Sequence, residues 1–550
     1  MELLRLLSER QHEHGYVSDE WLREVSKAKR VPLYRLEGLV SFYSSFRRTP
    51  PPPFVIRVCR DVSCAMAGCR DQVEKLKVAL AGRSNIEIQE VSCLGRCDAA
   101  PALTINDVPL APLTLADITQ VSRIVADSNS IESPTLAARS NDWRCDPYSS
   151  SKDPYATVQT LLQSGSIREL RQQCLERLSA AKLRGMGGAG FPTSKKWEMV
   201  AAEASHPKYV ICNADESEPG TFKDRLILSE LPHLVIEGML LGALTIGAEQ
   251  GIVFLRHEYE PERQRLQVAI ELARSAGVLG PNAAGSGQAF DVEIFVSPGG
   301  YILGEETALL EALEDKRGEP RNKPPYPGQQ GLWGRPTLIN NVETFAFATA
   351  IIHHGADWWR DQARPGFAGL KFVSVSGDVV RPGVYEISMG MTVAELIELA
   401  GGMRDGQRLQ AFLPGGASSH FLPADKVSTP LDFDAMKQAG SMLGTGAVIV
   451  IGERHELFDL AVNLVRFFRN ESCGKCVPCR LGSQQAVELL EAVQSGSRSV
   501  SALAELPILG ETLEQTSICG LGQVALNPYL SLQRNSPDAV KSSTENRHPE

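Results

Sequence analysis

The sequence lacks a long uninterrupted apolar run. Its most apolar region, residues 231–255, is interrupted by Glu237, Glu249 and several glycines, whereas a membrane-spanning helix needs about 20 nearly continuous apolar residues. The first residues carry charged side chains, among them Glu2 and Arg5, and contain no apolar core of a secretory signal. We therefore expect a cytoplasmic protein without a membrane span.

The chain also lacks an excess of basic side chains. It has 56 Lys and Arg against 66 Asp and Glu, which gives a net charge of −10. This balance excludes a general nucleic-acid binder, because phosphate contacts need a basic surface. Hydrophobic residues make up 43% and charged residues 22% of the 550, as is ordinary for globular proteins. This length exceeds the size of a single core, so we expect several compact units.

Strand-like and helix-like segments alternate along most of the chain and predict a multidomain α/β protein. Apolar residues at helical spacing over 1–48 give way to the tetraproline at 50–53. Within the large middle region, strands are predicted at 209–212, 251–255 and 292–296, and helices at 226–242 and 260–276. Thr392 is expected to cap a helix that reaches Leu399.

These patterns divide the chain into six parts. They are a helical segment at 1–50, a small α/β domain at 54–125, a linker rich in Ser, Asp and Pro at 126–165, a large α/β domain at 166–360, a β-rich domain at 369–455 and a helical region at 456–535.

The twelve cysteines are distributed unevenly. Eight fall into two tight groups, and the other four, Cys69, Cys145, Cys174 and Cys212, are scattered. In a reducing compartment, clustered cysteines indicate metal or redox chemistry rather than disulfides. The four scattered cysteines are expected to be small buried side chains.

The C-terminal group has three cysteines on one short loop and a fourth at a distance. Cys473, Cys476 and Cys479 are spaced Cys-x2-Cys-x2-Cys, and Cys519 follows forty residues later. This three-plus-one pattern can surround a cubane cluster with four thiolates, so it favours a [4Fe–4S] cluster. The alternative is a structural zinc site, although zinc favours paired Cys-x2-Cys units.

The N-terminal group consists of two pairs, each placed after a predicted strand. Cys59 and Cys64 form the first pair, and Cys93 and Cys97 form the second about thirty residues later. Two loops that each supply two thiolates suit a [2Fe–2S] cluster. Zinc is again the alternative.

A glycine-rich segment, Arg184–Phe191, contains a formal G-x-G-x-x-G pattern. The dinucleotide-binding fingerprint should follow a strand, but residues 170–183 have the pattern of a charged amphipathic helix, so this is not the ordinary Rossmann motif. The loop still allows backbone N–H groups to approach a phosphate or a flat ring, and Lys196 offers a cation nearby. The alternative is a plain flexible loop.

Three further runs carry polar side chains where α/β proteins form ligand sites. Residues 213–220 follow a strand, residues 301–307 open a helix after two glycines, and residues 340–344 stand at another helix start. The ends of parallel strands and the N-termini of helices favour bound anions. The acidic residues among them also have an ordinary explanation, because acids complement the dipole at a helix N-terminus.

Together these elements resemble the NADH-oxidising flavoprotein subunit of respiratory complex I and its relatives, which include diaphorase subunits of NAD-linked hydrogenases and beta subunits of NAD-linked, metal-dependent formate dehydrogenases. The matching stretches are Gly187–Thr193, Cys212–Arg225, Gly304–Leu310, Lys323–Pro325, Gly331–Thr344, Glu471–Arg480 and Ser517–Gly522. Residues 1–125 resemble the family's separate small subunit, a helical segment followed by a thioredoxin-like [2Fe–2S] domain, which is fused here.

The resemblance implies a Rossmann-like α/β domain for FMN, a β-grasp-like (SLBB-type) domain at 369–455 and a C-terminal helical bundle that carries the [4Fe–4S] cluster. It implies that FMN is held by Gly185, Gly187, Gly188, Gly190, Lys196, Asn213, Asp215, Glu216, Tyr301, Gly304, Glu305, Asn340, Asn341 and Thr344. NAD(H) would stack on the flavin and meet Phe191, Glu218, Glu306, Lys323 and Tyr326, with Glu218 and Glu306 as the carboxylates of the catalytic site.

The sequence departs from the family pattern around the nucleotide. Met186 stands where the family usually has Arg, Met199 stands where one aromatic residue commonly flanks the adenine, and Tyr326 replaces the Phe that commonly flanks it as well. Stacking on the adenine is expected to be weaker.

The resemblance implies hydride transfer between nicotinamide and flavin, with single electrons relayed through the clusters to a partner. The fused layout and the runs Phe412–Ser418, Pro430–Phe433 and Asn463–Phe468 are similar to formate dehydrogenase beta subunits. The expected partner is then a large molybdenum- or tungsten-pterin alpha subunit. The alternatives are a hydrogenase diaphorase, a fused complex I module, or a non-enzymatic zinc or iron–sulfur scaffold.

Overall fold

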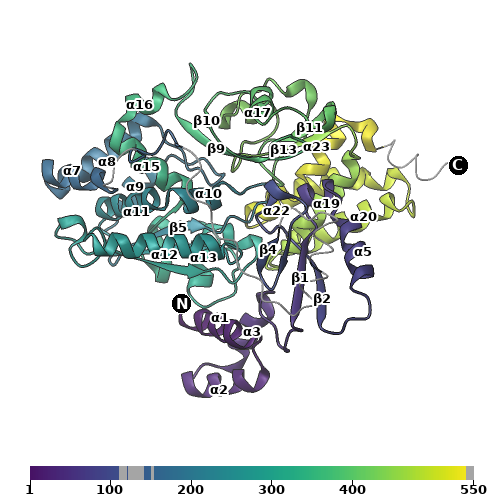
Figure 1. Cartoon of the computed structure of the whole chain (residues 1–550), viewed down its shortest axis with the longest axis horizontal. Coiled ribbons are helices and arrows are strands. Elements are labelled where there is room, and N and C mark those ends of the chain that lie inside the picture. Colours follow the sequence, from purple (N-terminus) through teal and green to yellow (C-terminus); the bar gives the residue numbers. More distant parts are fainter. Residues whose placement is uncertain (111–120, 122–141, 150–153, 541–550) are drawn as a thin grey trace.

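Three β-sheets organise the part of the chain that the computed structural model describes, residues 1–110, 121, 142–149 and 154–540 (Figure 1). Each sheet belongs to its own domain, and helices cover the sheets and fill the C-terminal region. The α/β multidomain architecture predicted from the sequence is confirmed.

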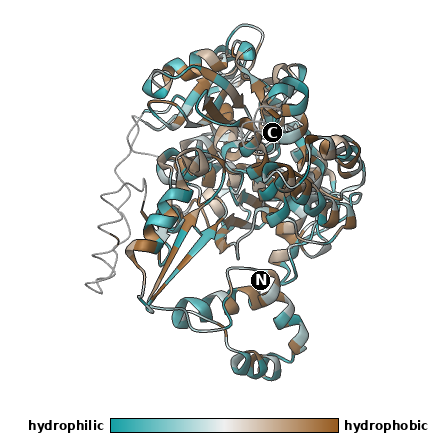
Figure 2. Ribbon diagram, turned by 90° about the vertical axis from the view of Figure 1, so that its right-hand side faces the viewer, coloured by the Kyte–Doolittle hydropathy of each residue, from teal (hydrophilic) through white to brown (hydrophobic). Residues whose placement is uncertain are grey.

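The chain begins with a small helical unit. Its helices are α1 (Glu2–His14), α2 (Asp19–Lys29) and α3 (Leu33–Phe42). Ser18 caps α2 by accepting a hydrogen bond from the Trp21 N–H. Figures 1 and 2 place this unit at the end of the molecule away from the five-stranded sheet. It is fixed to the large domain by Tyr43, whose hydroxyl donates to the Lys316 carbonyl at 2.6 Å.

The next domain is built on a four-stranded sheet of order β2-β1-β3-β4, in which β1 and β2 are parallel and the other pairs antiparallel. Its elements are β1 (Phe54–Cys59), α4 (Val62–Met66), α5 (Cys69–Ala79), β2 (Ile86–Val91), η1 (Cys97–Ala99), β3 (Leu103–Ile105) and β4 (Val108–Leu110). The two strands predicted before the N-terminal cysteine pairs are confirmed as β1 and β2.

The large domain contains a fully parallel sheet of order β7-β6-β5-β8. Its strands are β5 (Tyr209–Ala214), β6 (Gln250–Leu255), β7 (Asp291–Val296) and β8 (Thr337–Asn341). Its helices are α7 (Ala156–Ser164), α8 (Ile167–Ala181), α9 (Thr193–Ala202), α10 (Lys223–Glu230), α11 (Pro232–Ile246), α12 (Glu260–Ser275), α13 (Glu306–Leu313), α14 (Pro327–Gln330), α15 (Val342–His354) and α16 (Ala356–Asp361), with the short η2 (Ala283–Gly285), η3 (Tyr301–Gly304) and η4 (Leu332–Gly334). Since β6 and β7 extend the sheet on one side of β5 and β8 lies on the other, the order of strands reverses between β5 and β8, where ligands bind in open α/β sheets.

The third sheet has the order β10-β9-β13-β11-β12, with a parallel central pair, β9 and β13. Its elements are β9 (Leu370–Gly377), β10 (Gly383–Ser388), α17 (Val393–Leu399), η5 (Arg404–Gly406), β11 (Leu409–Leu413), β12 (Leu422–Pro423), η6 (Ala424–Lys426), α18 (Phe433–Gln438) and β13 (Ala447–Gly452). The predicted Thr392 cap is confirmed, because Thr392 and Glu395 form a capping box.

The C-terminal region is helical. It consists of α19 (Leu457–Glu471), a π-helical turn η7 (Pro478–Gly482), α20 (Ser483–Gln494), η8 (Val500–Glu505), α21 (Leu506–Thr516), α22 (Gly520–Val524) and α23 (Asn527–Asn535). Helix α19 packs on α4 of the first sheet domain as well as on α20 and α23, so it joins the two ends of the chain.

The structure differs from the sequence-based expectation at three places. The helix expected at 226–242 is broken between α10 and α11, because Pro232 starts a new helix and cannot continue the old one. Strand β8 was not predicted. The part of the expected linker that the structure describes is packed rather than extended, since Trp143, Cys145, Tyr148 and Tyr155 are buried in the core of the large domain; residues 126–141 and 150–153 lie outside the described residues.

Among the described residues, no single helix is long and apolar enough to cross a membrane. Helices α10 and α11 together have the length and apolar composition of a membrane span, but the chain bends by 93° between them.

Buried charges join the large domain to the five-stranded sheet. Glu343 on α15 and Lys371 on β9 are both inaccessible to solvent and form an ion pair of 2.6 Å, and Lys223 lies 2.9 Å from the same carboxylate. Burial lowers the pKa of Lys371 to about 8, although Glu343 opposes that shift. A buried pair of this kind fixes one arrangement of its two domains, because removal of either partner leaves an uncompensated charge.

Replacement of Lys371 by Met is expected to destabilise the protein by about 3–5 kcal/mol, because the Glu343 carboxylate would lose a buried partner. The measurement is the midpoint of thermal unfolding. Arg408→Met, which breaks the exposed ion pair with Glu453, is the matched control and should leave the midpoint unchanged. Equal midpoints for both variants would contradict a structural role for the buried pair.

Candidate functional site

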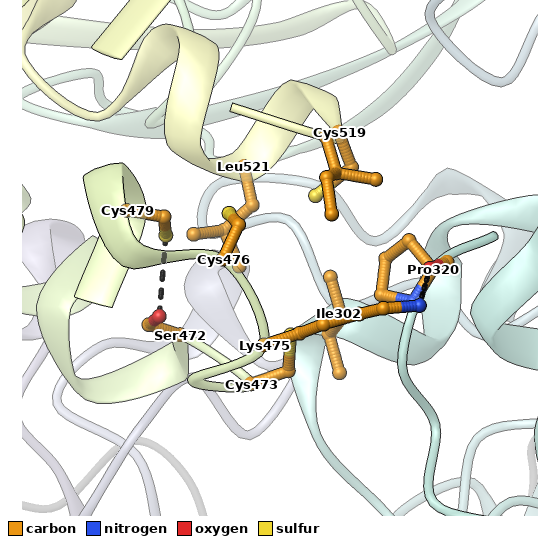
Figure 3. A pocket seen from close by; sticks show the side chains of 10 residues that line it. Ile302, Pro320, Ser472, Cys473, Lys475, Cys476, Cys479, Cys519 and Leu521 are labelled. Carbon is orange, nitrogen blue, oxygen red and sulfur yellow. Dashed lines mark hydrogen bonds between the residues drawn. The ribbon is translucent and has the colours of Figure 1, made fainter. Parts of the chain in front are cut away.

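The four cysteines of the C-terminal group line one pocket (Figure 3). Helix α19 ends at Glu471, the loop that follows carries Cys473 and Cys476, the π-helical turn carries Cys479, and Cys519 stands at the N-terminus of α22. Gly522 permits the close approach of these segments, since a Cβ there would lie 2.9 Å from the Cβ of Cys479. Residues forty positions apart in sequence therefore face one enclosed space.

The chemistry of this pocket fits a cationic iron–sulfur core. Burial raises the pKa of Cys479 to about 11 and that of Cys519 to about 12, so the bare thiols stay protonated at neutral pH, and metal coordination would deprotonate them. The backbone N–H groups of Leu521 and Gly522 lower the pKa of Cys519 against this effect of burial. They are placed to donate hydrogen bonds to a thiolate. The Lys475 ammonium donates to the Pro320 carbonyl at 2.6 Å, which ties this loop to the large domain.

The N-terminal cysteines also come together. Cys59 ends β1, Cys64 lies on α4, Cys93 lies on the loop after β2, and Cys97 begins η1; all four are buried. The Sγ atoms of Cys93 and Cys97 are 3.4 Å apart, and hydrogen bonds with Cys64 and Cys93 raise the pKa of Cys59. The Gly95 N–H donates to the sulfur of Cys93 and the Ala102 N–H to that of Cys64. This donor set fits a [2Fe–2S] cluster.

The four scattered cysteines are buried, as expected. Cys69 is the first residue of α5 and packs in the core of its domain.

The glycine-rich segment forms a tight loop between α8 and α9, with no strand before it. The Gly185 N–H donates to the Phe191 carbonyl at 2.8 Å, and the Met186 N–H donates to the Thr344 hydroxyl at 2.9 Å. Gly187 approaches Asn341 so closely that a Cβ would lie 3.0 Å from the Asn341 Cβ. The loop thus lies over the end of β8, beside the point where the sheet reverses.

The two asparagines that end β8 point in opposite directions, as successive residues of a strand do. Asn340 accepts a hydrogen bond from the Trp197 indole on α9, whereas Asn341 donates to Asp224 on α10 at 2.6 Å. At the end of β5, Asn213 donates to the Gly304 carbonyl at 2.8 Å. The predicted residues Asn213, Gly304 and Asn341 therefore lie together at the carboxyl ends of β5 and β8.

Two carboxylates of the predicted flavin site, Glu216 and Asp215, accept hydrogen bonds from other groups of this chain. Glu216 accepts from the N–H groups of Asp224 and Arg225 and from the Tyr259 hydroxyl, and burial raises its pKa to about 7. Asp215 accepts from the hydroxyls of Ser217 and Ser297.

Glu218 is held between two domains. It accepts hydrogen bonds from the Tyr301 hydroxyl at 2.6 Å and from the backbone N–H and hydroxyl of Ser418, at 2.7 and 2.9 Å. Burial raises its pKa to about 7, against the effect of these three donors. Since Ser418 belongs to the five-stranded domain, that domain completes this part of the site.

A second group of charges lies at the start of α13. Glu305 caps the helix by accepting from the N–H groups of Thr307 and Ala308. The Lys323 ammonium lies 2.9 Å from Glu305 and 3.3 Å from Glu306, and Lys196 lies 3.7 Å from Glu306. Phe191 and Tyr326 are about half exposed, at 45% and 53%, so their rings are available to a ligand.

Sequence reasoning missed three residues of this region. Arg256 and Tyr259 follow β6 and hold Glu216, and their place after a parallel strand is a signal that could have found them. Ser418 comes from another domain, and nothing local in the sequence indicates its contact with Glu218.

Replacement of Cys519 by Ser is expected to abolish the [4Fe–4S] signal in electron paramagnetic resonance and to remove about four of about six irons per chain. The [2Fe–2S] signal should persist, because its ligands lie in another domain. Cys174→Ala, at a buried site away from both groups, is the control and should keep both signals. Retention of all iron in the Cys519 variant would contradict the assignment.

Family models match most of the chain. They are the thioredoxin-like [2Fe–2S] ferredoxin over residues 1–126, the Nuo51 FMN-binding domain over 178–350, the SLBB domain over 372–421 and the NADH-ubiquinone oxidoreductase-F iron–sulfur binding region over 459–543. FMN, NAD(H), a [2Fe–2S] cluster and a [4Fe–4S] cluster are therefore the cofactors of this chain.

Similar proteins cover nearly the whole chain. An NADH-quinone oxidoreductase subunit of Rhizobium meliloti is 41% identical over 402 residues, which are 71% of this chain and 96% of the relative. The alpha subunit of the NAD-reducing hydrogenase HoxS of Cupriavidus necator is 33% identical over 569 residues, 98% of this chain and 91% of the relative. A crystal structure of an NAD⁺-reducing [NiFe]-hydrogenase in the H2-reduced state matches with a TM-score of 0.88 at 31% identity and covers 99% of this chain and 94% of that one.

The polar residues at the ends of β5 and β8, the two sets of four cysteines and these matches point to the same family. The chain belongs to the family of NADH-oxidising diaphorase subunits that carry FMN and relay electrons through iron–sulfur clusters.

Proposed function

We propose that this chain is the beta subunit of an NAD-dependent formate dehydrogenase and exchanges electrons between NAD(H) and a separate alpha subunit with a molybdenum- or tungsten-pterin site. The observation that carries the diaphorase part is the group of predicted flavin residues at the reversal point of the parallel sheet, together with the cysteine-lined pocket. The formate part is supported by the fused layout and by the runs at 412–418, 430–433 and 463–468. In this proposal the chain itself does not touch formate.

The residues at the ends of β5 and β8 and around them have distinct tasks in this proposal. The loop Gly185–Gly190 presents backbone N–H groups to the flavin, and Asn213 and Asn341 border it. Lys323 and Lys196 lie among carboxylates, where they can turn to nucleotide phosphates. FMN bound there would supply hydride chemistry with NAD(H) and one-electron exchange with the clusters held by the two cysteine sets.

Glu218 is proposed to face the nicotinamide ring. The Tyr301 and Ser418 donors fix the orientation of its carboxylate, so no rearrangement is needed when the ring arrives. The ring is neutral in NADH and positively charged in NAD⁺, so an ionised Glu218 favours the oxidised form of the nucleotide.

An exposed apolar surface beside the [4Fe–4S] pocket supports docking of a partner there. Val477, Leu481 and Ile508 are 55%, 58% and 72% exposed, and they lie on the cysteine loop, on η7 and on α21, which packs against η7. Exposed apolar side chains on neighbouring elements are a feature of interaction sites.

A second candidate is the diaphorase subunit of an NAD-reducing hydrogenase. It is favoured by the relative from Cupriavidus necator and by the crystal structure, both of which match this chain along almost its whole length. The two candidates share the chemistry of this chain and differ only in the partner.

Purification of the chain with its native partner is expected to separate the candidates. A co-purifying large subunit with molybdenum or tungsten and NAD⁺-dependent formate oxidation supports the formate proposal, whereas nickel in the partner overturns it. The isolated chain should reduce ferricyanide with NADH in either case. A chain that binds FMN but does not oxidise NADH or NADPH would refute the diaphorase function as well, and a colourless zinc protein would indicate a scaffold.

The affinity for NAD⁺ is expected to increase about tenfold between pH 6 and pH 8. The folded-state pKa of Glu218 is raised to about 7 by burial, so its negative charge develops as the pH rises through that value. The measurement is the product-inhibition constant of NAD⁺, with the KM for NADH as an internal control because the reduced ring is neutral. In Glu218→Gln the inhibition constant should not vary with pH; an unchanged profile in that variant would exclude Glu218 as the group that titrates.

A further inference from the structure

Glu471 hydrogen-bonds to two cofactor regions and adjoins the third in sequence, although it belongs to none of the predicted ligand sets. It is the last residue of α19 and precedes the cluster ligand Cys473 by two positions. One oxygen of its carboxylate accepts a hydrogen bond from the Tyr301 N–H at 2.9 Å, and the other accepts one from the Ser92 hydroxyl at 2.5 Å. The two donors are separated from Glu471 by 170 and 379 positions in the sequence.

Each of the two donors stands next to a cofactor region. Ser92 immediately precedes Cys93, a ligand of the [2Fe–2S] group, and Tyr301 opens the turn that holds Glu218 through its hydroxyl. The ring of Tyr301 also packs edge-on against Phe467 of α19, with 5.0 Å between ring centroids. The carboxylate of Glu471 is thus the point at which the loops of the [2Fe–2S], FMN and [4Fe–4S] sites meet.

The surroundings of this carboxylate favour a fixed position. Ser472 follows it and lies 3.2 Å from the Cys479 sulfur through its hydroxyl. On the other side, Asp61 accepts a hydrogen bond from the Cys93 N–H at 2.7 Å. Residues next to Glu471 and next to its donor Ser92 therefore make hydrogen bonds that involve ligands of both clusters.

We propose that Glu471 is a positioning residue for electron transfer: it sets the relative placement of the three cofactor loops, and its negative charge holds down the reduction potentials of both clusters. A reduced cluster carries one more negative charge than an oxidised one, so a nearby carboxylate disfavours reduction. This inference rests on FMN and the two clusters and not on the identity of the partner, so it stands whether the partner oxidises formate or hydrogen.

The test uses the full chain loaded with FMN and both clusters. In Glu471→Gln, which removes the charge with little change of shape, both cluster signals in an electron paramagnetic resonance titration should shift to higher potential. We expect the ratio of reduced to oxidised cluster at a fixed potential to rise roughly tenfold, equivalent to about 59 mV for one electron. Glu471→Asp restores the charge and should return the potentials toward those of the wild-type chain.

Two further variants separate charge from structure. Ser92→Ala removes only the hydrogen bond toward the [2Fe–2S] loop and should move the signal of that cluster alone. Glu237→Gln alters a buried carboxylate on α11 that accepts from Tyr148 and from the Val158 N–H, away from the cofactors, and should lower stability without moving either potential. Unchanged potentials in Glu471→Gln, with normal iron and flavin content, would overturn the proposal even if stability falls.

Discussion

Arg256 stands at the end of β6, and its guanidinium donates to two backbone carbonyls, that of Glu216 in the flavin region and that of Cys93 in the [2Fe–2S] loop. Arg225 likewise donates hydrogen bonds to the Gly95 carbonyl and, at 2.6 Å, to the Asp98 carboxylate. Arg256 is buried and the Arg225 side chain is only 11% exposed, and each is surrounded by groups that accept its hydrogen bonds, as a charge removed from water requires. The small iron–sulfur domain is thereby fixed against the large domain by cations that belong to the large domain, and the site depends on this junction.

Charged and hydrogen-bonded groups also connect the large domain to the five-stranded domain. Lys371 and Glu343 connect the five-stranded domain to the large domain, and Glu218 reaches Ser418 across that boundary. Apolar packing alone is not directional, whereas charged and hydrogen-bonded groups buried at a junction specify one orientation. A relay of electrons needs such fixed orientation more than it needs additional stability.

The sequence predicted those features that depend on local patterns. The spacing of Cys473, Cys476 and Cys479, the Thr392 cap and the helix before Gly185 each follow from residues close together in the chain. Strand β8 was missed because it is short and leads directly into α15, so its last residues have the pattern of a helix start. Pro232 broke a helix whose apolar pattern continues through it, although its fixed geometry is visible in the sequence. The contacts of Arg256, Ser418 and Glu471 could not be predicted, since their partners lie in other domains. No sequence pattern near these residues indicates such distant contacts.

One chain carries both sides of the junction between Arg225 and the Cys93–Cys97 loop. In relatives that correspond to only part of this chain, such as the NADH-quinone oxidoreductase subunit of Rhizobium meliloti, the segments beyond the match have no counterpart in the same polypeptide. Here the loop and the arginines meet at an effective concentration set by the connecting chain, and not by the amount of a second protein. Dilution cannot separate them, and every copy of the flavin site is made with its own [2Fe–2S] ligands in a fixed ratio of one to one.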